Sequence, residues 1–183
     1  FLISVQSDRG ISRMMPHQVS SRRLFSPQAA YIISHILSDN DARVPAFGYT
    51  SPLSFSFPCA AKTGTSKDFR DNWTIGYTPQ IVTGVWVGNT DNTEMENVPG
   101  SKGAAPVWNA FMSWAHEGLP LDSWPRPAGI SQMAVCETSG LLPTAQCPTV
   151  NEYFVEGTEP TVYDNMYQEF RINRETGRLA TLS

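Results

Sequence analysis

The sequence predicts an α+β fold, in which helices pack on an antiparallel sheet and a small β-rich module follows at the C-terminus. Apolar residues recur at helical spacing in residues 27–38, three short extended runs lie between residues 60 and 88, and a proline-rich stretch covers 119–129. With 40% hydrophobic and 16% charged residues, the 183-residue chain has the composition of a folded protein.

The first helix is predicted to begin at Pro27. Ser26 is a good N-cap residue, and proline is favoured at the first helical position because its missing N–H would have no helical partner there. The apolar residues that follow at helical spacing are Ala29, Ile32, Ile33, Ile36 and Leu37. We expect this face to lie on the core, the helix to end at residues 39–41, and residues 44–58 to form a loop with short extended pieces.

Three extended runs are predicted at residues 60–66, 73–78 and 81–88. The connections between them are short, and Pro79-Gln80 has the length of a hairpin turn. Because consecutive strands usually pair with one another, we expect an antiparallel meander. Residues 89–102 are polar and are expected to form a loop.

A second helix is predicted to open at Pro106, and Gly118 suits the C-cap position. The apolar positions of this helix share one stripe: Val107, Ala110, Phe111, Trp114 and Ala115.

A proline-rich stretch divides the chain. Residues 119–129 contain three prolines, which disfavour both a helix and a central strand. We therefore predict a first part at 1–118, a linker at 119–129 and a small β-rich C-terminal module at 130–183.

The charge balance argues against one class of partner. The formal net charge is -4 and the sequence pI is about 5.3, so there is no basic face to follow a phosphate backbone. We expect no nucleic-acid partner. No apolar run approaches the roughly 20 residues that are needed to cross a bilayer.

The cysteines are Cys59, Cys136 and Cys147, and they lack the paired C-x-x-C spacing of a zinc site. Neither a metal site nor a cofactor is predicted. Cys136 and Cys147 flank a loop that contains Gly and Pro, and the sequence is compatible with a disulfide between them or with two buried thiols. The histidines also lack ligand spacing: His17, His35 and His116.

The strongest chemical signal is Lys62-Thr63-Gly64-Thr65, at the point where an apolar run becomes polar. K-T-G is one of three motifs of serine enzymes that react with β-lactams. Lys62 would supply a positive charge beside the catalytic groups and a substrate carboxylate. Thr63 and Thr65 would donate hydroxyl hydrogen bonds, and Gly64 would let a substrate backbone lie close to the strand. The Thr65 N–H would help to form an oxyanion hole.

Segments on both sides of this tetrapeptide match one family in order. They are Ala42-Arg43, Phe47-Gly48, Ser51-Pro52-Leu53, Asp71-Asn72-Trp73, Gly76-Tyr77-Thr78-Pro79, Gly84-Val85-Trp86-Val87-Gly88, Ala104-Ala105-Pro106-Val107-Trp108, Ser139-Gly140-Leu141 and Gly157-Thr158-Glu159-Pro160. From about Ser26 to Trp114 the sequence resembles the transpeptidase domain of class A penicillin-binding proteins, most closely the 1C type. The segments after Cys136 resemble the region on the C-terminal side of this domain in such proteins.

The resemblance implies an incomplete penicillin-binding/β-lactamase-like transpeptidase fold. It implies a peptidoglycan D,D-transpeptidase, in which a serine attacks a D-Ala-D-Ala stem peptide and the acyl group passes to an amine. Lys62 would then be catalytic, and Thr63, Gly64 and Thr65 would bind the stem peptide or a β-lactam. The resemblance also implies the extracytoplasmic face of the bacterial membrane, in the periplasm or cell wall, with an anchor in a segment outside this chain.

The nucleophile motif of the family is absent, because no serine in the chain is followed by lysine three positions later. The letters of a second motif occur in Ser38-Asp39-Asn40, but there they follow a helix directly, and capping and turn formation account for them. We therefore expect the upstream part of the same polypeptide to complete the site, and this chain alone to be inactive.

Two alternatives stay open at this stage. A non-catalytic module that binds the cell wall or a partner would keep the scaffold without the chemistry, and a D,D-carboxypeptidase or β-lactamase-like enzyme would pass the acyl group to water. A partial domain should also expose apolar surface on its first helix and its meander. The rest of the polypeptide, or a homodimer, would cover that surface.

Overall fold

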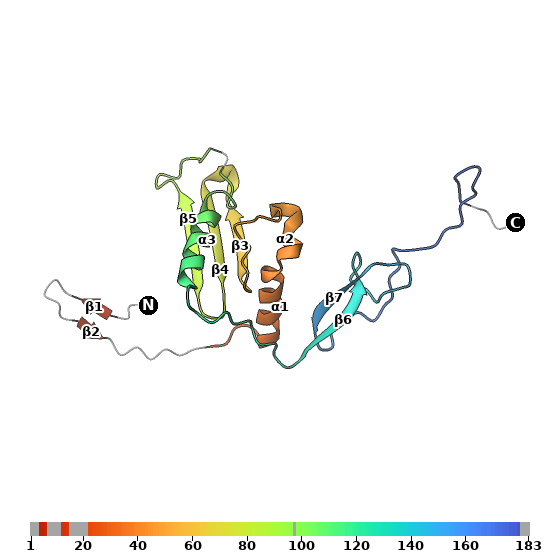
Figure 1. Ribbon diagram of the computed structural model, residues 1–183, viewed down its shortest axis with the longest axis horizontal. Helices are drawn as coiled ribbons and strands as arrows, with labels where there is room; N and C mark the ends of the chain where they lie inside the picture. Colours follow the sequence, from red (N-terminus) through yellow and green to blue (C-terminus); the bar gives the residue numbers. More distant parts are fainter. Residues whose placement is uncertain (1–3, 7–11, 15–21, 97, 180–183) are drawn as a thin grey trace.

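The computed structural model describes residues 4–6, 12–14, 22–96 and 98–179. Figure 1 shows its helices and strands in chain order. They are β1 (Ser4–Gln6), β2 (Ser12–Met14), α1 (Pro27–Ser38), α2 (Asn40–Phe47), β3 (Ala60–Thr65), a 3-10 turn (Lys67–Phe69), β4 (Asp71–Tyr77), β5 (Val82–Gly88), α3 (Ala104–Ala115), β6 (Ile130–Cys136) and β7 (Thr149–Val155).

The centre of the fold is an antiparallel sheet with the strand order β3-β4-β5, so the expected meander is confirmed. The backbone N–H of Thr78 donates to the carbonyl of Ile81 at 2.8 Å and closes the expected turn at Pro79-Gln80. Helix α3 packs on β4 and β5, and α1 packs on β3. In Figure 1, α3 crosses in front of the sheet while α1 and α2 lie beside β3.

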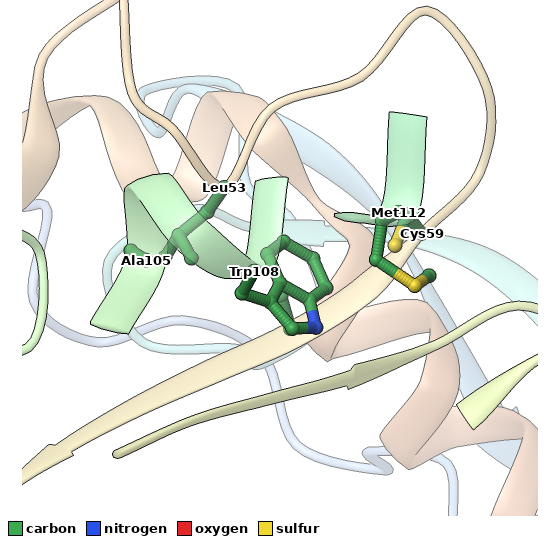
Figure 2. Close-up of a cluster of buried hydrophobic side chains, with 6 residues drawn as sticks. Leu53, Cys59, Ala105, Trp108 and Met112 are labelled. Carbon is green, nitrogen blue, oxygen red and sulfur yellow. The ribbon is translucent and has the colours of Figure 1, made fainter. Parts of the chain in front are cut away.

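The core lies between α3 and one face of the sheet. Its buried members are Leu53, Cys59, Ala61, Ala105, Trp108 and Met112. Figure 2 shows Trp108 lying over the strands. The indole N–H of Trp108 donates to the carbonyl of Thr83 at 3.2 Å, so the polar atom of this fully buried ring is paired.

The apolar stripe identified on α3 from the sequence is not the face that the helix buries. Trp108 and Met112 are fully buried, whereas Val107, Phe111 and Trp114 are 56%, 44% and 65% exposed. The helix carries two apolar stripes, and periodicity alone does not rank them. The structure selects the stripe whose indole fits over a glycine of β4.

A second helix, α2, replaces part of the loop that was predicted at residues 44–58. A carboxylate oxygen of Asp39 accepts the backbone N–H of Ala42 at 3.0 Å, so Asp39 caps this helix. Pro45 lies inside it and lacks the N–H for one helical bond. The prediction failed because the residues that end α1 also begin α2.

Helix α1 begins at Pro27 as predicted, and the hydroxyl of its N-cap Ser26 accepts the N–H of Ala29 at 3.1 Å. Its apolar face is only partly packed, because Ile33 and Ile36 are 52% and 57% exposed. The expectation that this face lies on the core is therefore wrong for these two residues and for Ala29, which is also exposed. The tyrosine hydroxyl of Tyr77 pairs with Ser34 at 2.9 Å and joins the helix to β4.

Strands β6 and β7 form a separate antiparallel pair, and residues 116–129 before it form neither helix nor strand. The pair contacts α1 through the ring of Tyr153, which lies 4.6 Å from the ring of His35. The amide of Gln28 donates to the carbonyl of Ala128 at 2.7 Å. Within the described residues, every helix is too short or too polar to span a bilayer.

Replacing Gly76 with alanine should destabilise the protein by about 3 kcal/mol, because the new methyl group overpacks the core. A Cβ at this position would lie 2.2 Å from the indole of Trp108 and 2.6 Å from the carbonyl oxygen of Ala60. Gly84→Ala is the matched control, since its Cβ would meet only Ile75, at 3.5 Å. Urea unfolding checks this, and equal stability of the two variants would contradict the proposed packing.

Candidate functional site

The predicted site residues Lys62, Thr63, Gly64 and Thr65 occupy the second half of β3, an outer strand of the three-stranded sheet. Lys62, Gly64 and Thr65 are exposed and Thr63 is half-buried. The ammonium group of Lys62 donates to the carbonyl of Thr63. Since β3 pairs only with β4 among the described strands, its other edge keeps unpaired backbone groups that an extended peptide can bind.

A cavity of about 230 Å³ adjoins the first residues of this strand. Lys62 and Thr63 line one side, and apolar residues of α1 and α2 line the other. The full lining is Ile36, Leu37, Asp39, Ala42, Arg43, Phe47, Leu53, Ala61, Lys62 and Thr63. The cavity therefore offers the ammonium group of Lys62, the hydroxyl of Thr63 and a mostly apolar wall to a small ligand, while its second cation, Arg43, is bonded to backbone carbonyls.

Arg43 holds the helical wall of this cavity against the strand. Its guanidinium donates to the carbonyls of Leu37, of Leu53 (3.1 Å) and of Cys59 (3.4 Å). Burial lowers the pKa of Arg43 from its ordinary value, and Cys59 and Asp39 oppose that shift. The same burial raises the pKa of the Cys59 thiol to about 12, so this thiol stays protonated and unreactive at neutral pH.

The loop before α3 lies against the other end of the motif. The hydroxyl of Thr65 accepts the backbone N–H of Gly100 at 3.0 Å. Gly100 is itself buried, and a Cβ there would approach Thr63 Cβ to 3.0 Å and the Gly64 carbonyl to 3.1 Å. Only a residue without a side chain allows the loop to come this close to the strand.

Asn72 fixes that loop to the sheet. Asn72 is fully buried. It lies beside the motif, because it pairs with Thr65 across the β3–β4 ladder. The amide group donates to the carbonyl of Val98 at 2.6 Å and accepts the N–H of Ala104 at 3.1 Å. One side chain thus holds the loop and satisfies a free N–H at the start of α3.

The structure explains Ser38-Asp39-Asn40 by local roles. Asp39 caps α2, the hydroxyl of Ser38 donates to the carbonyl of His35 at 3.0 Å, and the amide oxygen of Asn40 accepts from Arg43. These contacts confirm that capping and turn formation account for the three residues.

The histidines lie in unrelated surroundings. His116 is buried, with Nε2 paired to the hydroxyl of Thr78 at 2.9 Å and Nδ1 to the carbonyl of Met112 at 2.8 Å, so it is a satisfied core residue. His35 stacks edge-on against Tyr153. His17 lies outside the described residues.

Asn72→Ala should lower the free energy of unfolding by about 2 kcal/mol, because it leaves the partly buried carbonyl of Val98 and the buried N–H of Ala104 without partners. It should also speed proteolysis of the loop at residues 98–103. Asn89→Ala is the matched control, since the amide of Asn89 donates to the carbonyl of Thr93 from an exposed position. Unchanged proteolysis of the Asn72 variant would show that Asn72 does not hold the loop.

The chain is similar in sequence to penicillin-binding proteins of the 1A type. Residues 126–169 match the family described as penicillin-binding protein 1A, C-terminal domain. The chain is 33% identical to penicillin-binding protein 1A of Clostridium botulinum (strain Langeland) over 182 residues, which is 95% of this chain and 22% of that protein. It is 34% identical to penicillin-binding protein 1A of Escherichia coli K12 over 115 residues, 55% of this chain and 13% of the relative.

The fold agrees with a solved relative. The crystal structure of penicillin-binding protein 1A from Haemophilus influenzae matches with a TM-score of 0.66 and 25% identity, over 78% of this chain and 22% of that one. The predicted α+β fold with an antiparallel sheet is thus confirmed. The chain spans about a fifth of the length of the Clostridium and Haemophilus relatives, and the matches support the 1A type without singling out the 1C type.

Proposed function

We propose, from the homology of this chain to the C-terminal region of penicillin-binding protein 1A, that it forms part of a peptidoglycan D,D-transpeptidase. Such an enzyme crosslinks cell-wall peptides by serine acyl transfer, and this chain supplies its substrate-binding strand. The observation that carries the proposal is the placement of K-T-G on the outer strand β3, beside a cavity with Lys62 on one side and a mostly apolar wall on the other.

Each residue of the motif has a role that its position supports. The exposed ammonium group of Lys62 is able to leave the Thr63 carbonyl and attract the substrate carboxylate. Thr65 uses its hydroxyl oxygen to accept from Gly100, and it keeps its O–H free to donate to substrate. Gly64 leaves the strand surface open, since only Trp73 Cβ lies within 4 Å of a Cβ built there.

The reaction needs a nucleophile from elsewhere. A serine oxygen of the upstream part attacks the carbonyl of the penultimate D-Ala, the terminal D-Ala leaves, and an acyl-enzyme remains. An amine of a neighbouring peptide then attacks the ester and releases the serine. The K-T-G strand orients the peptide, and its N–H groups stabilise the oxyanion.

An open sheet face provides the surface for the upstream part. Trp73, Ile75, Val82 and Trp86 share the face opposite α3 and are 45%, 48%, 73% and 43% exposed. Apolar patches on a soluble surface commonly mark an interface. The expected exposure of the meander is therefore confirmed, and we assign this face to the upstream part of the same polypeptide, with a homodimer as the alternative occupant.

The same proposal places the protein at the extracytoplasmic face of the bacterial membrane, anchored through a segment outside this chain. Its substrates are peptidoglycan stem peptides, and β-lactams are inhibitors that mimic them. Residues 1–118 belong to the transpeptidase domain, 119–129 form a linker and 130–183 form a β-rich module.

Covalent labelling with a fluorescent penicillin tests the proposal on the full polypeptide, its Lys62→Ala variant and this chain alone. We expect the full polypeptide to be labelled, the variant to be labelled about 100-fold more slowly because a transition-state charge is lost, and the chain alone to remain unlabelled. Lys67→Ala is the matched control, since Lys67 is an exposed lysine just beyond β3.

The other outcomes separate the alternatives. Labelling of this chain alone would place a nucleophile within it and refute the split site. An unlabelled full polypeptide would favour a non-catalytic wall-binding or partner-binding module. Release of D-Ala from a stem peptide without crosslinked product would identify a D,D-carboxypeptidase, and rapid hydrolysis of the penicillin would identify a β-lactamase-like enzyme.

A further inference from the structure

The segment after the linker has little apolar core of its own. Its hydrophobic residues that are buried within the described part are Ile130, Val135, Cys136 and Cys147, and its only long strands are β6 and β7. Units below roughly 70 residues usually need a disulfide or a metal to supplement such a core. Two of the four buried residues, Cys136 and Cys147, carry thiols. Thiols in the core can form a disulfide or bind a metal ion.

Three side chains with metal-binding atoms meet there. Cys136 ends β6, Cys147 lies just before β7, and Asp164 lies in the following loop. Their sulfur and carboxylate atoms all lie within 4.8 Å of one another. The backbone N–H groups of Leu142 and Asp164 bond to the carbonyls of Val162 and Leu142 at 2.9 and 2.8 Å, and this ladder brings the distant aspartate to the thiols.

The carboxylate of Asp164 is the observation that points to a cation. The residue is only 7% exposed, and its Oδ2 accepts the backbone N–H of Tyr167 at 2.9 Å. Its Oδ1 is buried and accepts no hydrogen bond of normal geometry, although the Ser139 hydroxyl and the Cys136 thiol are nearby donors to this carboxyl. A buried carboxylate oxygen in this state is costly unless a positive charge approaches it, and no lysine, arginine or histidine forms an ion pair with it among the described residues.

We propose that Cys136, Cys147 and Asp164 bind one Zn²⁺ ion. Two thiolates and one carboxylate form a donor set that suits zinc better than calcium or magnesium, which prefer oxygen ligands alone. Ligands of a tetrahedral zinc ion lie roughly 3.3 to 3.8 Å apart, so small side-chain rotations close the triad on the metal. Both thiols release a proton on binding, and water completes the fourth position.

A disulfide between Cys136 and Cys147 is the alternative way to cross-link this segment. It would consume both thiols and leave Asp164 Oδ1 without a partner, whereas a cation satisfies all three groups at once. Zinc binding therefore gives a partner to Asp164 Oδ1, which a disulfide does not. The sequence predicts no metal here because it has no C-x-x-C pair, and only the fold brings the third ligand near.

Zinc binding is measured on the 183-residue chain, purified with a phosphine reductant, stripped with a chelator and then titrated with Zn²⁺. We expect one zinc per chain by elemental analysis, a higher thermal midpoint, and a thiolate charge-transfer band when Cd²⁺ replaces zinc. Cys136→Ser and Asp164→Asn should each weaken zinc binding at least tenfold, because each removes a ligand. The Asp164→Asn variant keeps the side-chain shape and both thiols, so it also controls for misfolding.

Two control variants make the test specific. Cys59→Ser removes a buried thiol outside the cluster, and Glu169→Gln removes an exposed carboxylate, so both should bind zinc as the parent chain does. Unchanged zinc affinity in Asp164→Asn would overturn the three-ligand site. A reduced chain that takes up no zinc would overturn it too, and an intact mass lower by two hydrogens in chain purified without reductant would then identify the disulfide. Neither outcome bears on penicillin labelling.

Discussion

The close approach of Trp108 to Gly76 is the contact on which the main body of the structure depends. The indole packs so near to β4 that a Cβ on Gly76 would lie 2.2 Å from it, and its N–H is satisfied by β5. Through this contact α3 is placed across the sheet, and the loop that enters α3 is placed over the end of β3. The position of the candidate site therefore depends on core packing about one turn into the same helix.

Local signals in the sequence predict the parts of the fold that local chemistry controls. The Ser26-Pro27 start of α1 and the turn between β4 and β5 belong to this group, since each depends on neighbouring residues. The buried face of α3 does not, because Val107 and Trp108 belong to two different apolar stripes and the fit of the indole over Gly76 is visible only in the fold. Helix α2 was missed because Asp39 acts at the end of one helix and as the cap of the next.

The candidate site likewise contains residues that the sequence predicts and residues that it does not. Its motif, Lys62 to Thr65, can be recognised from the sequence alone, and the structure places it on an outer strand. Arg43 and Asn72 carry no such signature, because their partners are backbone carbonyls and N–H groups up to 32 residues away in the chain. Asp164 is hidden for a similar reason, since its approach to the thiols requires a loop pairing that no local spacing shows.

The two faces of the sheet differ in a way that couples stability to assembly. One face is closed by the chain's own helix, and the opposite face leaves two tryptophans nearly half exposed. Fully burying a large apolar side chain is worth roughly 1.5 to 3 kcal/mol, so covering these two half-exposed rings adds about half of that for each to a marginal free energy of unfolding. A ligand that binds across β3 and the covering part would stabilise both together, which is the linkage expected of a site shared between two parts of one polypeptide.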